Sequence, residues 1–204
     1  MTLERALTDA LGPLGFRRVN EPGLGKAWQR ELGDYVQTID VQVSPNDLST
    51  AAVNVRVADK FIWRVLLAAD PFRPRVLLDN VDVRLGRLLG PTDRWWKRSN
   101  PADQLEVKEA VLTYAAPLIE RVSSPEGMRD YLESKIASRW GGTLGQEQDL
   151  AILHWRLGNR DRGPELLAEQ PRRVREHERA MAVVEGILRL CREGDPSVFE
   201  AKPS

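Results

Sequence analysis

The sequence predicts an α+β fold, with an antiparallel sheet of about four to five strands packed by helices and followed by a C-terminal helical extension. Three observations lead to this prediction. Apolar residues alternate with polar ones in several runs between residues 26 and 85, which is typical of strands. These runs follow one another on short loops, which favours antiparallel pairing with helices on one face. After residue 100 the apolar spacing becomes helical.

The first strands follow an N-terminal helix. Gly12-Pro13 is expected to end this helix early, because proline cannot donate the backbone hydrogen bond of a continuing helix. The first two long strands are expected to pair across a turn at Gly33-Asp34. The expected elements are a helix over 3–14, an extended segment over 16–19, a turn over 21–25, strands over 26–30 and 35–43, and a loop over 44–50.

The middle of the chain contains two further strands and one ambiguous segment. Alternating valines and polar residues predict strands over 53–57 and 81–85. Residues 59–69 carry apolar side chains at helical spacing, but their β-branched content also fits a strand. The sequence leaves both alternatives open.

The rest of the chain is predicted to be helical. Asn100 before Pro101 is a typical helix start, and Ser124 before Pro125 is a second one. Pro117 is expected to kink or break the first of these helices.

The last third is predicted to hold further helices. They are expected over 146–157, 164–169 and 172–192, with a frayed tail from Gly194 onward. The first two resemble a single helical pair of a tetratricopeptide repeat, and one pair is too few for a stacked array. The predicted division is an α+β domain over 1–140 and a C-terminal helical hairpin or extension over 141–204 packed on it, with one continuous domain as the alternative.

Composition narrows the classes of function. The 204 residues carry 30 Lys+Arg and 30 Asp+Glu, so the formal net charge is zero. A nucleic-acid-binding protein usually has a basic excess, so that role would need a local patch. The predominance of arginine among the basic residues is typical of GC-rich bacterial genes. No stretch has the ~18 apolar residues of a membrane span, and the N-terminus lacks the features of a signal peptide, so we predict a cytoplasmic protein without membrane association.

Residues suited to catalysis are scarce. Cys191 is the only cysteine and lies on an apolar helix stripe, so it is expected to be a small core residue. His154 is expected to be packed and hydrogen-bonded, and His177 to lie on a charged surface. No zinc-ligand spacing, phosphate-binding glycine loop or nucleophile motif occurs. We predict no metal and no cofactor, and favour a function other than catalysis, with a carboxylate-based enzyme as an alternative.

The strongest functional signal is the segment RLGRLLGPTDRWWKRSN over 84–100. Its basic and aromatic side chains have the character of a surface that stacks bases and contacts phosphates. The alternative is structural, because tryptophan buries a large area and usually packs. One of two neighbouring tryptophans then faces the core and the other its rim. The candidate binding residues are Arg84, Arg87, Arg94, Trp95, Trp96, Lys97 and Arg98.

A series of short motifs over about residues 1–140 resembles the bacterial domain-of-unknown-function family 4304. The resemblance implies a small cytoplasmic α+β protein without an assigned activity, so it transfers no catalytic residue. It also implies that Arg84-Leu85-Gly86 and Trp95-Trp96 define the fold. The long 44–50 loop and the arginine-rich helical tail depart from the family pattern. The motifs are LGF at 14–16, WQRE at 28–31, GDYVQTIDVQVS at 33–44, VRLGRLL at 83–89 and Trp95-Trp96.

These observations favour a non-enzymatic protein that binds another macromolecule. A protein partner is the leading expectation, with a toxin-neutralising immunity protein as its most specific form, by analogy alone. Binding of single-stranded nucleic acid through the Trp/Arg segment is the alternative, which the zero net charge disfavours. A homodimer through the last helix or an exposed sheet edge is a further option.

Overall fold

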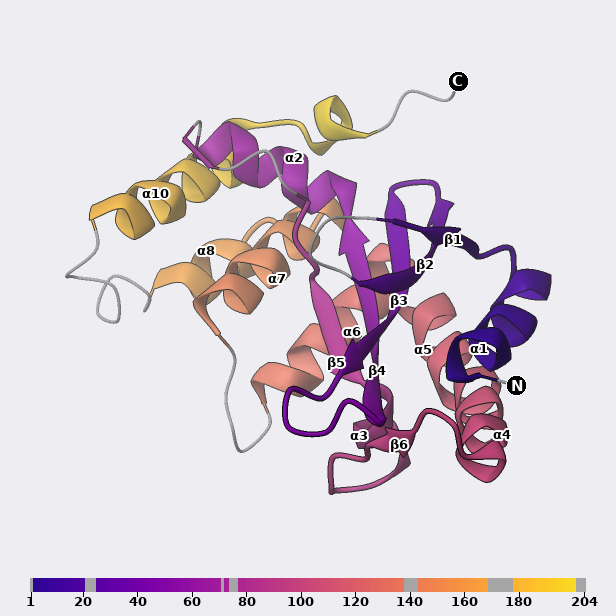
Figure 1. Cartoon of the computed structure of the whole chain (residues 1–204). Coiled ribbons are helices and arrows are strands. Elements are labelled where there is room, and N and C mark those ends of the chain that lie inside the picture. The colour runs from indigo at the N-terminus through magenta and orange to yellow at the C-terminus, as the bar shows by residue number, and fades with distance from the viewer. Residues whose placement is uncertain are drawn as a thin grey trace. The chain divides into compact units, whose positions relative to one another are not determined.

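The computed structural model has the predicted α+β architecture, with an antiparallel sheet and helices that include the C-terminal part of the chain (Figure 1). It describes residues 2–20, 25–70, 72–73, 77–137, 143–168 and 178–200. The chain forms two compact units, each built from two segments. The first unit consists of Met1–Ala58 and Val81–Arg121, and the second of Asp59–Asn80 and Val122–Ser204.

The sheet is the centre of the first unit. Its hydrogen-bonded order is β1-β2-β3-β4-β5, and β6 pairs with β4 beside β5. The predicted hairpin is confirmed, since Lys26–Leu32 pairs antiparallel with Tyr35–Val43 across the Gly33-Asp34 turn. The strands are β1 Arg17–Val19, β2 Lys26–Leu32, β3 Tyr35–Val43, β4 Thr50–Asp59, β5 Val81–Arg84 and β6 Trp96–Lys97.

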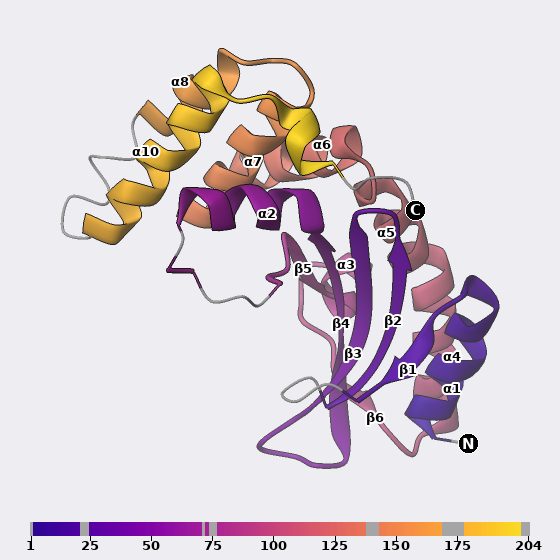
Figure 2. The ribbon, with the colours of Figure 1, turned by 90° about the horizontal axis from the view of Figure 1, so that it is seen from above.

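One face of the sheet is apolar and packs against helices of the same unit. The predicted alternation places the valines of β4 on this face, and α1 (Leu3–Leu11) lies beside α4 (Pro101–Ala110) next to the sheet (Figure 2). Trp28 of β2 is buried there, and its indole Nε1 donates to Thr8 Oγ1 of α1 at 3.1 Å. The fully buried side chains of this core include Leu3, Leu7, Leu11, Trp28, Ile39, Val53, Val55, Val57, Val81, Leu85 and Trp96.

The predicted helix start at Asn100 is confirmed, whereas Pro117 lies inside a helix. Asn100 caps α4 by accepting from the Ala102 N–H at 3.0 Å, and Pro101 is the first helical residue. Pro117 does not break the helix that follows. The backbone widens into a π-helical turn over Val111–Ala115 and continues as α5, Ala116–Val122, because the wider turn accommodates a residue that cannot donate to the ladder.

The second unit is helical. Helix α7 packs against α6 and α8, and α10 packs against α2 and α8. The contact of α10 with α2 requires Gly186, since a Cβ there would lie 2.8 Å from the carbonyl oxygen of Ala69. The helices are α2 Lys60–Ala69, α6 Pro125–Ile136, α7 Leu144–Arg156, α8 Arg162–Ala168 and α10 Glu178–Glu193.

The ambiguous segment 59–69 is a helix, α2. Asp59 caps it, because its carboxylate accepts from the Phe61 N–H at 2.7 Å. The apolar side chains at helical spacing, Phe61, Ile62, Val65 and Leu66, are buried on one face. This burial decides in favour of the helix over the strand that the β-branched residues also allowed.

The prediction of a frayed tail is wrong for residues 196–200. Pro196–Phe199 forms a short 3-10 helix that Asp195 caps. The Phe199 ring packs edge-on against Phe61 at 6.1 Å and Trp155 at 5.8 Å between ring centroids. Aromatic packing therefore orders a segment whose composition alone suggested disorder.

Some predictions lie outside the described residues, namely most of the 21–25 turn, the first part of the 172–192 helix and the position of His177. Among the described residues, no helix is both long and apolar enough to cross a bilayer.

Candidate functional site

The 84–98 segment forms the connection from β5 through α3 (Leu85–Leu89) to β6. Trp96 pairs with Ala51 of β4, and its side chain is fully buried in the apolar face of the sheet. Strand alternation then places Trp95 on the opposite face. The two tryptophans thus divide between core and rim, as the structural alternative predicted.

Arg84 and Trp95 come together at the end of β5. The guanidinium carbon of Arg84 lies 4.9 Å from the centroid of the Trp95 ring, which is cation–π geometry. Arg84 also donates to Gln42 Oε1 at 3.1 Å and forms an ion pair with Asp93. These three partners fix the position of the guanidinium group.

A surface hollow of about 390 Å³ opens beside this pair, and we call it the Trp95 hollow. It lies in the first unit, at the edge where β3 leads into the 44–50 loop. Its volume is within the range of small-ligand sites, which is about 300–1,000 Å³. The lining residues are Gln42, Ser44, Pro45, Asn46, Thr50, Arg84 and Trp95.

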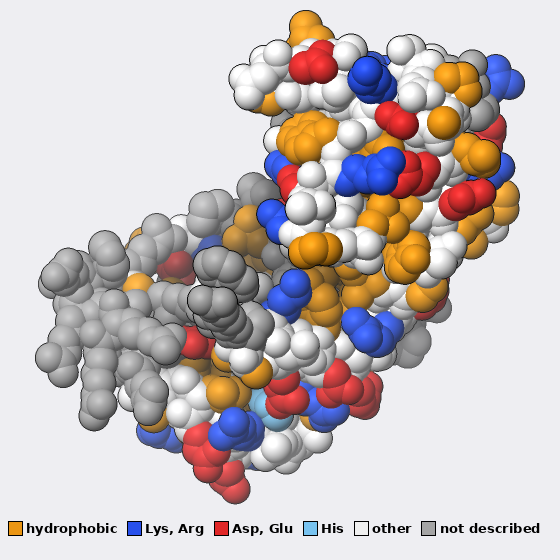
Figure 3. All heavy atoms as spheres, turned by 90° about the horizontal axis from the view of Figure 1, so that it is seen from below, with side chains coloured by type: hydrophobic (Ala, Val, Ile, Leu, Met, Phe, Trp, Pro, Cys, Tyr) orange, Lys and Arg blue, Asp and Glu red, His pale blue; other side chains and the backbone are white. Residues whose placement is uncertain are grey.

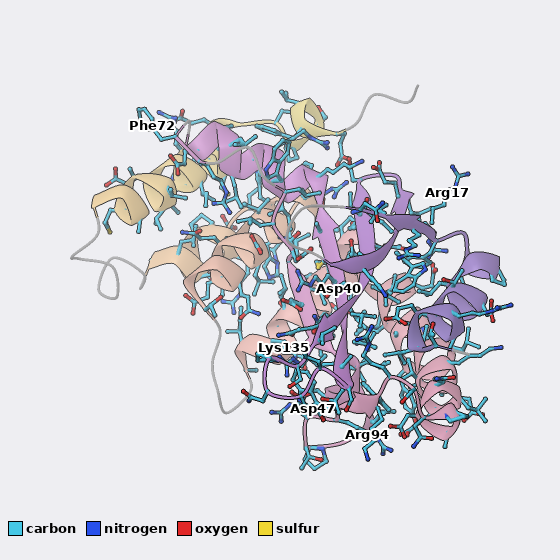
Figure 4. The ribbon with its side chains drawn as sticks, in the orientation of Figure 1. Arg17, Asp40, Asp47, Phe72, Arg94 and Lys135 are labelled. Atoms are coloured by element: carbon cyan, nitrogen blue, oxygen red, sulfur yellow. The ribbon has the colours of Figure 1, made fainter. Side chains whose placement is uncertain are left out.

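The 44–50 loop is held by its own hydrogen bonds. Ser44 Oγ accepts from the backbone N–H groups of Asn46 and Asp47 at 3.3 and 3.2 Å. The Asp47 carboxylate accepts from the hydroxyl and the N–H of Ser49, and these two hydrogen bonds lower the pKa of Asp47. The loop, in which Figure 4 labels Asp47, is therefore a preformed wall of the hollow.

The other basic candidates have structural partners. Arg94 pairs with Glu106 at 2.5 Å, and Arg87 donates to the Pro91 carbonyl at 2.6 Å. The Lys97 N–H donates to Asp103 at 2.6 Å, while its side chain is exposed. None of these three residues lines the Trp95 hollow.

Arg98 connects three elements of the first unit. Its guanidinium donates to Glu4 of α1 at 2.7 Å and to the Leu48 carbonyl at 3.2 Å, and its own carbonyl accepts from Gln104 of α4. Burial raises the pKa of Glu4, but the hydrogen bonds from Arg98, its backbone and Lys26 outweigh this and lower it to about 2. The structure therefore gives Arg98 a role in the fold.

A row of polar side chains crosses the sheet face that carries the hollow. Asn54 donates to Asp40 at 2.9 Å, and Arg56 pairs with the same carboxylate at 2.9 Å. Burial raises the pKa of Asp40, although Asn54 and Arg56 act in the opposite direction. The Asp40 charge is thus held by two neighbours in the middle of the sheet (Figure 4).

The lining of the hollow is mostly uncharged. Arg84 is the only ionisable residue among the seven that line it, so the lining supplies no general base or acid of ordinary pKa. In the described part of the chain, no group of three or more His, Cys, Asp or Glu residues could hold a metal ion.

The cysteine and the described histidine lie in the second unit and are buried. Burial raises the pKa of the Cys191 thiol to about 11, so it holds its proton at neutral pH. Burial also lowers the pKa of His154, whose Nε2 lies 3.1 Å from a Glu133 carboxylate oxygen. Both residues are packed as predicted.

The sequence analysis did not identify Gln42, Ser44, Asn46 and Thr50 as part of a site. Gln42 belongs to the end of β3, Ser44 and Asn46 to the loop that follows it, and Thr50 to the start of β4. The signal that was available is the turn chemistry of Ser44-Pro45-Asn46-Asp47, since serine and asparagine hold such turns with their side chains. What brings this loop to Trp95 is the pairing of β6 with β4, which is a long-range contact.

The candidate site therefore consists of two predicted residues, Arg84 and Trp95, and a loop that encloses them. Searches for relatives add nothing to this description: no protein-family model, no curated protein and no solved structure matches the chain.

Proposed function

We propose that this chain is a non-enzymatic binding protein of the bacterial cytoplasm that holds a protein partner at the Trp95 hollow. The observation that carries the proposal is the lining, in which a stacked arginine and tryptophan are framed by uncharged hydrogen-bonding side chains. Arginine and tryptophan are enriched among the residues that dominate binding energy at protein interfaces. Neutralisation of a toxin is the most specific form of this function.

The lining of the hollow favours binding over carboxylate-based catalysis. A hydrolase of that kind needs carboxyl groups that face the substrate. A buried carboxyl on the same sheet face, Asp40, is paired with Asn54 and Arg56. The charge of Asp40 is therefore paired within the sheet.

The ion pairs of the segment weigh against nucleic-acid binding. Arg94 and Arg98 are paired with Glu106 and Glu4. Acidic and basic side chains also alternate over the described part of the face shown in Figure 3, where no large area of one sign stands out. Phosphate contacts would have to compete with these carboxylates, and Trp96, the second predicted stacking platform, is buried.

We also propose kinship with the domain-of-unknown-function family 4304. The positions of two motifs support it, because Arg84-Leu85-Gly86 spans the end of β5 and the start of α3, and Trp96 enters the core. Under such kinship, the buried residues of these motifs would define the fold, and the motif residues at the rim of the sheet would bind the partner.

Site-directed photo-crosslinking tests the proposed function. A benzoylphenylalanine residue at Asn46, which lines the hollow and is exposed, is introduced in cells of the native host. We expect one discrete protein adduct on irradiation. The matched control places the same group at Asp9, an exposed residue of α1 in the same unit.

The adduct should disappear when Ser44→Trp fills the hollow. Adducts of the same masses from both positions, or none from Asn46, would show that the hollow holds no protein partner. An adduct that survives Ser44→Trp would move the partner away from the hollow.

A further inference from the structure

The Trp95 hollow is rich in hydrogen-bond donors. The carbonyl oxygen of the Gln42 side chain accepts from Arg84 at 3.1 Å, which leaves the amide NH₂ to donate elsewhere. Ser44 Oγ already accepts two backbone N–H bonds, so its hydroxyl hydrogen is its means of contact with a ligand. A donor-rich surface is complementary to a group with several acceptor oxygens.

Arg84 adds a positive charge to these donors. A guanidinium group has five N–H donors, and within the described part of the chain one goes to Asp93 and one to Gln42. The others remain to bind a further group. Arginine with a planar set of donors matches the two oxygens of a carboxylate better than any other common group except phosphate.

Asp93 binds Arg84 through only one of its two carboxylate oxygens among the described contacts. Its Oδ2 bonds the guanidinium, whereas its Oδ1 is buried and has no hydrogen-bond partner among the described residues. An unsatisfied buried acceptor is costly. Asp93 lies in the connection between α3 and β6, outside any helix or strand.

We propose that the Trp95 hollow recognises an acidic side chain of a partner protein, whose carboxylate replaces Asp93 on Arg84. The incoming carboxylate pairs with the guanidinium and accepts from Gln42 and Ser44. The methylene groups of the side chain pack on Trp95. Asp93 is thus an internal competitor that fills the position until the partner arrives. This inference rests on the proposed function and names the chemistry that the partner presents.

The test uses the purified full-length chain and two capped tripeptides, acetyl-Ala-Glu-Ala-amide and acetyl-Ala-Gln-Ala-amide, at matched ionic strength. The readout is the indole N–H cross-peak of Trp95 in a ¹H–¹⁵N spectrum, assigned by its loss in Trp95→Phe. We expect the glutamate peptide to shift this peak to saturation and the glutamine peptide to leave it unchanged.

Two variants test the roles of the charged pair. Arg84→Lys keeps the charge but loses the planar donors, so we expect binding of the glutamate peptide to weaken by about tenfold. Asp93→Asn removes the competing charge, so we expect binding to strengthen by about tenfold. Arg94→Lys is the matched control, since Arg94 lies next to Trp95 in the chain but pairs with Glu106 outside the hollow. It should bind like the unmodified chain.

Several outcomes would overturn the inference. Equal shifts with both peptides would mean recognition of a carbonyl rather than a carboxylate. No shift with either peptide, or unchanged affinity in folded Asp93→Asn, would show that a peptide carboxylate does not compete with Asp93 for Arg84. If these results occur while the Asn46 crosslink still forms, the ligand class fails but the binding function stands. If the glutamate peptide binds and no crosslink forms, the site takes a carboxylate but the protein-partner function fails.

Discussion

At the scale of single residues, the adjacent tryptophans Trp95 and Trp96 have different structural roles. Trp96 is fully buried, and Trp95 is half-buried at the hollow. We expect Trp96→Ala to lower the free energy of unfolding by about 3–5 kcal/mol, because it leaves a large cavity in the core. Trp95→Ala should cost less than about 1 kcal/mol. Urea denaturation measures both, and equal losses for the two variants would contradict this division.

A milder substitution separates packing from hydrogen bonding at Trp96. Its Nε1 is buried and has no hydrogen-bond partner among the described residues. Trp96→Phe removes this unpaired donor and keeps most of the apolar volume, so it should be better tolerated than Trp96→Ala. The sequence predicted the split between core and rim, but not which tryptophan goes where, since that depends on the register of β6 on β4.

The buried carboxyl of Asp149 makes stability depend on pH. Burial raises its pKa to about 6, although the hydrogen bond from Asn80 and the charge of Arg73 act to lower it. The folded chain holds this proton more tightly than the unfolded chain does. The stabilisation is therefore complete below the unfolded pKa of about 3.9, and it is lost as the pH rises through about 6.

Asp149→Asn tests this dependence. Asparagine keeps an oxygen that accepts from Asn80 Nδ2, whose present bond to Asp149 is 2.9 Å. At about pH 8 we expect the variant to be more stable than the unmodified chain by about 2–3 kcal/mol, with a much smaller difference at about pH 4. Urea denaturation over this range gives the values, with the exposed Asp9→Asn as control. Parallel pH profiles for unmodified chain and variant would refute the effect.

At the scale of elements, the turn from α3 to β6 depends on a close backbone approach. A Cβ on Gly86 would lie 2.5 Å from the Arg94 nitrogen and 2.9 Å from its carbonyl oxygen. Backbone atoms cannot move aside as a flexible side chain does, so Gly86→Ala must displace the residues that lead into β6.

We expect Gly86→Ala to destabilise the first unit by about 2 kcal/mol and to broaden or shift the Trp95 and Trp96 indole signals. Gly90→Ala is the control, since nothing lies within 4 Å of a Cβ there and its φ of 175° is extended backbone that any residue adopts. A variant with unmodified stability and unshifted indole signals would show that the loop rearranges freely.

Most elements were predictable because their signals are local. The caps at Asn100 and Ser124 lie within three residues of the N–H groups that they satisfy, and the hairpin lies within one continuous stretch. Residues 59–69 were not decidable, because helix and strand differ there only in what the side chains pack against. The rule that proline kinks or breaks a helix does not predict the π-helical turn before Pro117.

At the scale of the whole molecule, the order of segments along the chain differs from their grouping into compact units. Residues 59–80 group with the helices after residue 121, although strands on both sides of them belong to the sheet. Each compact unit takes two segments of the chain. The division at residue 140 stays a prediction. Of the site, the sequence identified Arg84 and Trp95, whereas the loop joins them only through β-sheet pairing.

The ordered tail shows the same long-range dependence and gives a final prediction. Phe199 closes an aromatic cluster with Phe61 and Trp155, and Glu200 pairs with Arg156, which also binds the buried Asp59 at 3.2 Å. The tail therefore joins two segments that are distant in sequence, residues 59–61 and 155–156. Phe199→Ala should lower the free energy of unfolding by about 2–3 kcal/mol, since it removes a ring from a packed cluster. Val198→Ala, at a side chain that is 74% exposed, should change it by less than about 0.5 kcal/mol. Thermal denaturation compares the two, and equal melting temperatures would mean that the tail adds nothing to the stability of the second unit.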